Sequence, residues 1–312
     1  MRNVAFTYRK MFDEFGLQTD VKTLRFDRNI EYDGEYTDYV HFIGSGYSLN
    51  IIRDMVFPYR SENLKIYNTT KLRPGDSRSF VLIHDLYYDG SDMKIIRWKH
   101  SQTLDIMRKH NIPFITVSNY TAEKLRNIGL DGVVIHPLPY DLQPTIDKDN
   151  IILTVGSQEA RKNVEFMNFF TSPSFLDHRK YTPIKVGGGL RFGENLFNIS
   201  NDELNKLYSK SKFLLFPSFD EGFGLPVLEG LLHRCIVISN NIPTSKEIDM
   251  GQNIIEFIDV NNSKNLFPNI TSFVDEIQDK RRDYEAWFEK YRKMVDDDMR
   301  KFVEYIEERG WT

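Results

Sequence analysis

The chain has 312 residues, 40% of them hydrophobic and 28% charged, which is enough for two domains with real cores and excludes a disordered tail. Forty-five acidic against 41 basic residues leave a net charge of −4, which argues against a protein that binds nucleic acid by neutralising its phosphates. The single cysteine, the lack of an apolar run of the roughly 20 residues that span a bilayer, and the charged start of the chain together predict a cytoplasmic protein.

The first half of the chain alternates short β-branched or aromatic runs with turns and polar stretches. This rhythm predicts six strands and one long helix over Ile95–His110. The strands are expected at Val4–Phe6, Val21–Phe26, Tyr39–Ile43, Phe80–His84, Pro113–Val117 and Val133–His136.

A linker is predicted over Pro137–Asn150, where three prolines and a polar run separate two strand signals. It divides the chain into an N-terminal Rossmann-like domain over residues 1–146 and a C-terminal Rossmann-like domain over residues 147–283. A helical segment over residues 284–312 completes the predicted organisation.

The second half is more regular, with apolar strands that alternate with helical stretches. Strands that are apolar on both faces are typical of a parallel sheet covered by helices on both sides. We therefore expect an α/β protein of two doubly wound domains that face each other across a cleft, where ligands bind at the carboxyl ends of the strands. The strands are expected at Ile151–Val155, Pro183–Val186, Phe213–Phe216, Cys235–Ser239 and Ile254–Ile258, and the helices at 162–170, 201–210, 226–233 and 243–249.

Residues 284–312 have an amphipathic helical pattern. Charges of both signs fill one face, so the pattern predicts a helix that packs back on the protein's own body, with a helix lying on a membrane surface as the alternative. The apolar face consists of Tyr284, Trp287, Phe288, Tyr291, Met294 and Val295, and continues with Phe302, Val303 and Ile306.

The segment Phe216–Gly230 carries the densest signal for a ligand site. Gly222 and Gly224 allow a tight turn after a buried strand, and Pro226 suits the first turn of the helix that follows. The main-chain N–H groups of Phe223, Gly224 and Leu225 should then point at a ligand at the positive end of a helix dipole. Two carboxylates, Glu221 and Glu229, bracket this turn; solvated acids at an ordinary strand–turn–helix corner are the alternative.

A second candidate segment is Ile151–Val164, in which an apolar strand runs into Gly156. The loop then presents two adjacent cations, Arg161 and Lys162, at the start of a helix. Positive charge is electrostatically disfavoured at a helix N-terminus, and a bound anion would explain it. A guanidinium, an ammonium and helical N–H groups together suit a diphosphate.

These segments resemble a known family. Glu221 to Glu229, with its Gly-Phe-Gly-Leu-Pro interior, resembles the Glu-x7-Glu signature of retaining GT-B glycosyltransferases, in particular the nucleotide-sugar-dependent family 4. The segment Gly156-Ser-Gln-Glu-Ala-Arg-Lys-Asn163 is similar to that family's Gly-Thr-Leu-Glu-Pro-Arg-Lys-Asn. Further matching segments are Val117–Leu125, Asp202–Tyr208 and Phe213–Ser218, so the resemblance covers residues 112–260 and is weak before residue 80.

The resemblance implies roles for individual residues. Glu229 would hold the ribose hydroxyls of a donor nucleotide, and Glu221 would grip the donor sugar together with the main chain of Gly222, Phe223, Gly224 and Leu225. Arg161 and Lys162, beside Gly156, would neutralise the diphosphate, and His84 would contact the sugar from the end of its strand. The glycine pair that the family has near its N-terminus is missing here, and Gly44 and Gly46 are candidates for a replacement loop, with an ordinary turn as the alternative.

The implied activity is a retaining transfer of a sugar from a nucleotide-diphosphate sugar to an acceptor, which could be a glycan, a lipid, a protein or a small molecule. No metal and no other cofactor is expected if the cations and helix N–H groups stabilise the leaving diphosphate. With Glu229 on the ribose, attack on the same face is expected rather than a double displacement.

Three alternatives remain open. A metal-dependent GT-A transferase would need an Asp-x-Asp at a strand end, but we interpret Asp147-Lys-Asp149 and Asp296–Asp298 as solvent-facing acids. A sugar-nucleotide epimerase or hydrolase shares the two-domain shape and would need no external acceptor. A transferase-like binding module without turnover is the third alternative.

Overall fold

The computed structural model describes residues 11, 19–24, 37–44, 47–53, 78–83, 104, 107–109, 111, 113–138, 141–144, 147–262 and 270–309. The chain divides into two compact units. The C-terminal unit comprises chiefly Tyr140–Lys293, and the N-terminal unit comprises Asn3–Pro139 together with Met294–Thr312. The division after Pro139 falls inside the linker expected over Pro137–Asn150.

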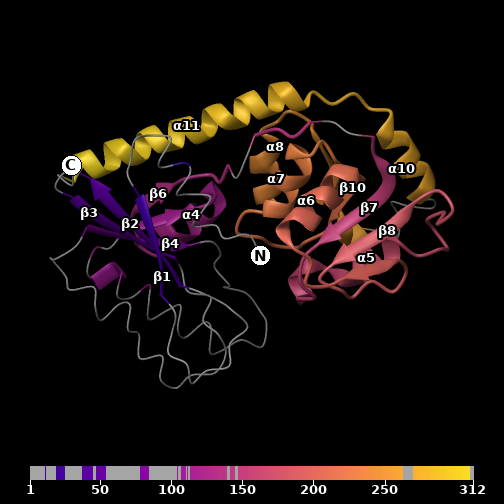
Figure 1. Ribbon diagram of the computed structural model, residues 1–312, viewed down its shortest axis with the longest axis horizontal. Coiled ribbons are helices and arrows are strands. Elements are labelled where there is room, and N and C mark those ends of the chain that lie inside the picture. The colour runs from indigo at the N-terminus through magenta and orange to yellow at the C-terminus, as the bar shows by residue number, and fades with distance from the viewer. Residues whose placement is uncertain are drawn as a thin grey trace, which may run out of the picture. The chain divides into compact units, whose positions relative to one another are not determined.

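Six parallel strands form the sheet of the C-terminal unit, in the order β12-β11-β10-β7-β8-β9. Figure 1 labels β7, β8 and β10 of this sheet. The chain runs outward from β7 through β8 to β9, then returns to β10 on the other side of β7 and continues to β12. The prediction of a doubly wound sheet is confirmed for this unit. The strands are β7 (Asp149–Val155), β8 (Thr182–Val186), β9 (Glu194–Leu196), β10 (Ser211–Phe216), β11 (Ile236–Asn240) and β12 (Ile255–Ile258).

This strand order has a functional consequence, because the winding direction reverses between β7 and β10. Open α/β sheets bind ligands at such a switch point, outside the carboxyl ends of the strands. The segments that follow β7 and β10 are the two that carry the sequence signals described above.

Four helices of the C-terminal unit lie within two residues of the predicted ranges. The helix α6 starts with a capping box, in which Ser200 and Glu203 satisfy each other's main-chain N–H groups. The helix α7 approaches β10 closely, since a Cβ atom at Gly230 would lie 2.6 Å from a methyl carbon of Leu214. Neither β9 nor α10 was predicted from the sequence. The helices are α5 (Val164–Phe170), α6 (Asn201–Lys210), α7 (Leu225–Leu232), α8 (Pro243–Asp249) and α10 (Ile270–Gln278), with 3₁₀ turns η1 (Ala160–Lys162) and η2 (Val260–Asn262).

The sheet of the N-terminal unit follows chain order, β1-β2-β3-β4-β5-β6. The strands β3 to β6 are parallel, with the helix α4 (Asn119–Asn127) between β5 and β6, whereas β1, β2 and β3 are antiparallel. The α/β class is thus confirmed, and a doubly wound order is not present among the described strands of this unit. The strands are β1 (Thr19–Leu24), β2 (Thr37–Gly44), β3 (Tyr47–Arg53), β4 (Arg78–Ile83), β5 (Phe114–Thr116) and β6 (Gly132–Val134).

Gly44 ends β2 and pairs with Tyr47, the first residue of β3, in antiparallel register. A connection this short makes a hairpin, whereas a dinucleotide-binding loop leads from a strand into a helix. The structure therefore favours the turn interpretation of Gly44. Gly46, the predicted strand Val4–Phe6 and most of the predicted helix over residues 95–110 lie outside the described residues.

The helix α11 (Tyr284–Glu308) is continuous over 25 residues and buries its apolar face. Trp287 and Tyr291 are buried in the C-terminal unit, and Met299 and Phe302 are buried in the N-terminal unit. The prediction that this helix packs against the protein's own body is confirmed.

The interpretation of the acids on α11 as solvent-facing is wrong for Asp298, which is 6% exposed. Its spacing from the buried Val295 and Phe302 places it on the apolar face. Its carboxylate accepts the main-chain N–H of His136 at 3.1 Å and lies 2.5 Å from the Nδ1 atom of the same residue. Hydrogen bonding to His136 explains how a charged group is accommodated there.

Candidate functional site

The loop after β7 and the turn after β10 are hydrogen-bonded to each other at the switch point. The main-chain N–H of Phe219 donates to the carbonyl oxygen of Arg161 at 2.8 Å. Asn163, in a left-handed conformation, accepts from the Phe166 N–H to cap α5, and its side-chain amide donates to the Pro217 carbonyl at 3.3 Å. These bonds fix the position of η1, which carries Arg161 and Lys162.

Both cations of η1 contact one carboxylate. The Nη1 atom of Arg161 lies 2.6 Å from Oε2 of Glu221, and the Nζ atom of Lys162 lies 2.5 Å from its Oε1. Arg161 also pairs with Glu159 at 2.8 Å. The exposed fractions are 23% for the Arg161 side chain, 12% for that of Lys162 and 7% for that of Glu221. Both cations are only partly exposed because they pair with Glu221 on the turn.

The turn after β10 delivers the chain into α7. Gly222 and Phe223 are buried within it, and Gly224 has φ +102°, in the left-handed region that favours glycine. Pro226 lies in the first turn of α7, as predicted. Within the described residues, the main-chain N–H groups of Gly224 and Leu225 make no hydrogen bond, so α7 presents two donors and the positive end of its dipole at the switch point.

Glu229 lies one turn inside α7 and is 5% exposed. Its main-chain carbonyl accepts from both the N–H and the Nδ1 atom of His233. Glu221 and Glu229 are thus both buried carboxylates at the two ends of the same turn. This arrangement differs from the alternative of solvated acids at a surface corner.

The end of β8 contributes a residue that the sequence analysis did not select. Lys185 is fully buried, and its ammonium donates to the carbonyl oxygen of Gly156 at 2.5 Å. Gly187 permits this approach, because a Cβ atom there would lie 2.2 Å from the Gly156 oxygen. A lysine inside the apolar run Pro183–Val186 is the signal that could have revealed it, since lysine is almost never fully buried unless it is paired.

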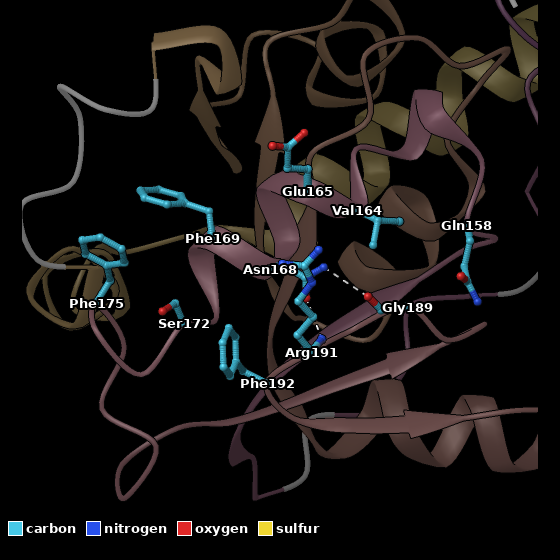
Figure 2. A pocket seen from close by; sticks show the side chains of 10 residues that line it. All are labelled: Gln158, Val164, Glu165, Asn168, Phe169, Ser172, Phe175, Gly189, Arg191 and Phe192. Carbon is cyan, nitrogen blue, oxygen red and sulfur yellow. Dashed lines mark hydrogen bonds between the residues drawn. The ribbon is translucent and has the colours of Figure 1, made fainter.

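A hollow of about 570 Å³ lies beside α5, a size typical of small-molecule sites (Figure 2). Three phenyl rings line it, and Asn168 joins its two sides by accepting from the Arg191 N–H and donating to the Gly189 carbonyl. Neither Glu221 nor Glu229 lines this hollow. The lining residues are Gln158, Val164, Glu165, Asn168, Phe169, Ser172, Phe175, Gly189, Arg191 and Phe192.

The remaining predicted residues do not join this cluster in the described part of the chain. His84 follows β4 directly but lies outside the described residues, so its predicted contact with a sugar stays a prediction. Asp147 and Asp149, at the start of β7, are exposed, in agreement with their interpretation as solvent-facing acids.

Two features are absent from the described residues. No group of three or more His, Cys, Asp or Glu side chains there is arranged to hold a metal ion. No helix in the same residues combines the length and the apolar character needed to cross a membrane.

The site lies in a region that matches a family model. Residues 194–290 match the model described as Glycosyl transferases group 1, and this stretch contains β10, the turn with Glu221 and all of α7. This part of the chain is therefore similar to group 1 glycosyltransferases, in agreement with the prediction of a glycosyltransferase.

Two curated relatives of this chain are named as mannosyltransferases. The chain is 26% identical over 199 residues to the O-antigen chain mannosyltransferase RfbU of Salmonella typhimurium, covering 54% of this chain and 53% of that protein. It is 47% identical over 171 residues to the serotype-specific mannosyltransferase WbdA of Escherichia coli, covering 47% of this chain and 20% of that protein. The chain thus spans about half of the first relative and a fifth of the second.

Among solved structures, WaaG, a glycosyltransferase involved in lipopolysaccharide biosynthesis, aligns with a TM-score of 0.48 at 13% identity over 70% of each chain.

Proposed function

We propose that this protein is a retaining GT-B glycosyltransferase that moves a mannosyl residue from a nucleotide-diphosphate sugar to a glycan acceptor without a metal ion. The observation that carries the proposal is the pair of adjacent cations, Arg161 and Lys162, held on Glu221 beside the N-terminus of α7. An anion that enters this corner would meet a guanidinium, an ammonium and two main-chain N–H groups.

The choice of mannose rests on the relatives, since both RfbU and WbdA are named as mannosyltransferases. The choice of a glycan acceptor rests on the same names, because one of them is an O-antigen chain enzyme. A lipid, a protein or a small molecule are the other acceptors that the sequence leaves open. We further propose that the protein works in the cytoplasm, where nucleotide sugars are available, and contact with a membrane surface is the alternative.

The proposed chemistry depends on charge that develops as the bond to the diphosphate breaks. The leaving oxygen becomes more negative while the sugar carbon becomes oxocarbenium-like, so preorganised donors stabilise the transition state more than the ground state. Arg161, Lys162 and the N–H groups of Gly224 and Leu225 are these donors. Because they need no reorganisation during the reaction, they can replace a divalent cation.

The two carboxylates take different parts in this mechanism. Glu229, inside α7, would accept hydrogen bonds from the ribose hydroxyls. Glu221 would face the sugar and, before the donor binds, serve as the counter-ion of Arg161 and Lys162. With Glu229 on the ribose, no second carboxylate is left for a double displacement. The acceptor is therefore proposed to attack on the face from which the diphosphate leaves.

A donor screen followed by a transfer assay tests the proposal. Thermal stability is measured with GDP-mannose, UDP-glucose and UDP-N-acetylglucosamine, because a ligand at 100 times its Kd adds about 2.7 kcal/mol of apparent stability. The stabilising donor is then incubated with a mannose-terminated glycan, and NMR gives the anomeric configuration of the product. Retained α-configuration in an elongated glycan supports the proposal. Hydrolysis or epimerisation without an acceptor, or binding without turnover, would each favour one of the alternatives instead.

A further inference from the structure

Lys185 is a buried cation for which the fold provides no counter-ion. It lies in β8 with no exposed surface. No carboxylate in the described part of the chain forms an ion pair with it, and its one hydrogen bond goes to the neutral carbonyl of Gly156. Burying an ammonium in this way is unfavourable unless another negative group compensates for it.

The place of this ammonium connects it to the candidate site. Gly156 directly follows the last residue of β7. A Cβ atom on Gly156 would lie 3.6 Å from the Cδ atom of Lys162. The stem of Lys162 therefore packs on Gly156, while Lys185 bonds to the carbonyl of the same residue. The two lysines reach the loop from η1 and from β8.

The charges at this corner do not balance. Arg161, Lys162 and Lys185 contribute three positive charges, and Glu159 and Glu221 contribute two negative ones. One positive charge remains, and it belongs to the most buried of the three cations. An ammonium also has three N–H donors, of which Lys185 uses one on Gly156.

We propose that Lys185 supplies the third positive charge of the anion site, where it attracts a diphosphate group that Arg161 and Lys162 bind directly. The recognition of a diphosphate is the chemistry inferred here; that the diphosphate belongs to a nucleotide sugar rests on the proposed function. Lys185 acts on binding through its charge, and no bond is made or broken at it.

This role makes binding depend on pH. Burial and then the nearby charge of Lys162 lower the pKa of Lys185 from 10.5 to about 8. The other charged groups at the corner are Arg161, Glu159 and Glu221. A bound diphosphate favours the protonated ammonium, so binding near pH 8 should take up about half a proton, and affinity should fall as the pH rises above 8.

The experiment is isothermal titration of the full chain with GDP, UDP and inorganic pyrophosphate between pH 7 and 9.5, in pairs of buffers with different ionisation enthalpies. Lys185→Met keeps the length of the side chain and removes the charge. Lys148→Met is the matched control, because Lys148 is a partly buried lysine whose pKa is also lowered by burial. The ammonium of Lys148 donates to the carbonyls of Tyr208, Ser209 and Ser211. Lys148 directly precedes β7 and so lies at the amino end of this strand, whereas Gly156 lies at its carboxyl end. Variants are compared with the same probe, so that titration of the probe cancels.

For the wild type we expect proton uptake near pH 8, and for Lys185→Met an affinity about tenfold lower at pH 7 with no proton uptake. Lys148→Met should match the wild type in both respects. Equal affinity and equal proton uptake in Lys185→Met would overturn the inference while leaving the proposed function intact. Binding of pyrophosphate through Lys185 without binding of GDP or UDP would contradict the proposed function and support the inference. If none of the three probes binds, both are overturned.

Discussion

The main-chain N–H of Phe219 donates to the carbonyl oxygen of Arg161 at 2.8 Å, and this bond joins the loop after β7 to the turn after β10. It involves no side-chain atoms, so substitutions of the charged side chains should leave the two loops in register. Changes in the chemistry of the site can therefore be separated from changes in its architecture.

Arg161→Ala and Lys162→Ala should each lower kcat by roughly 10²-fold, the scale for removing one preorganised donor. Each should also lower the free energy of unfolding by about 1–3 kcal/mol, since the nearly buried Glu221 loses one of its two partners. Sugar transfer and urea unfolding measure the two effects. Arg179→Ala is the control, because Arg179 is 93% exposed and pairs with Asp177 at the surface. Near-wild-type turnover in both site variants would show that the diphosphate binds elsewhere.

The two glutamates should differ when they are changed to glutamine. Glu229→Gln should weaken the binding of the nucleoside diphosphate, because contacts with the ribose exist equally in the ground and transition states. Glu221→Gln should lower kcat, and it should tighten the binding of the bare nucleoside diphosphate because Arg161 and Lys162 lose a competing anion. Titration calorimetry and kinetics on both variants provide the comparison. The reverse pattern would mean that the two roles are exchanged.

Sugar transfer should survive treatment with EDTA, because cations and main-chain N–H groups at the switch point stabilise the leaving diphosphate. The measurement is the initial rate of transfer with and without chelator, followed by addition of Mn²⁺. A complete loss of rate that Mn²⁺ restores would contradict the metal-free mechanism and favour the GT-A alternative.

Asp298→Asn should destabilise the protein by about 1–3 kcal/mol, because a charged acceptor for two groups of the buried His136 becomes a neutral one. Asp297→Asn is the neighbouring control. Asp297 is half-buried and pairs with Arg300 along the helix, an interaction worth about 0–1 kcal/mol. Urea unfolding of both variants gives the comparison, and equal losses would mean that the His136 contact contributes no more than a surface pair.

Lys185 should also affect how stability depends on pH. Its pKa is about 8 in the fold, against 10.5 for an unperturbed lysine. Below pH 8 both states hold the proton and the cost of burying the charge is fully present. Between pH 8 and 10.5 the unfolded chain binds more protons, so stability should rise with pH by up to about 1.4 kcal/mol per unit. Relative to the wild type, Lys185→Met should lack this rise in urea unfolding at pH 7.5 and 9.5. An identical slope in both proteins would show that Lys185 does not titrate in this range.

The C-terminal sheet could be predicted from sequence because its five longer strands are apolar runs that end in glycine or turn residues. The edge strand β9 was not predicted, since its three residues carry no periodicity. The nine-residue helix α10 was also missed, although Ile270, Val274 and Ile277 recur at helical spacing. In the N-terminal unit, β3 begins so soon after Gly44 that the sequence pattern predicts one strand followed by a glycine loop, whereas the structure has two paired strands.

For the candidate site, the sequence located Glu221, Glu229, Arg161 and Lys162, and the structure brings Glu221 and both cations together. The ion pairs could not be predicted, because they join residues about 60 positions apart in the chain. Lys185 was missed for a related reason. Its burial becomes apparent only when β8 pairs with β7 and Gly187 allows the carbonyl of Gly156 to approach.

The continuous helix α11 has a consequence for the order in which the protein can fold during synthesis. Its first ten residues belong to the C-terminal unit, and the residues from Met294 onward complete the N-terminal unit. Domains generally fold as they emerge from the ribosome, the N-terminal one first. Here the buried Asp298 that binds His136, and Phe302 beside it on the helix, are made only after the whole C-terminal unit. The packing of the N-terminal unit therefore stays incomplete until the C-terminal unit has been synthesised.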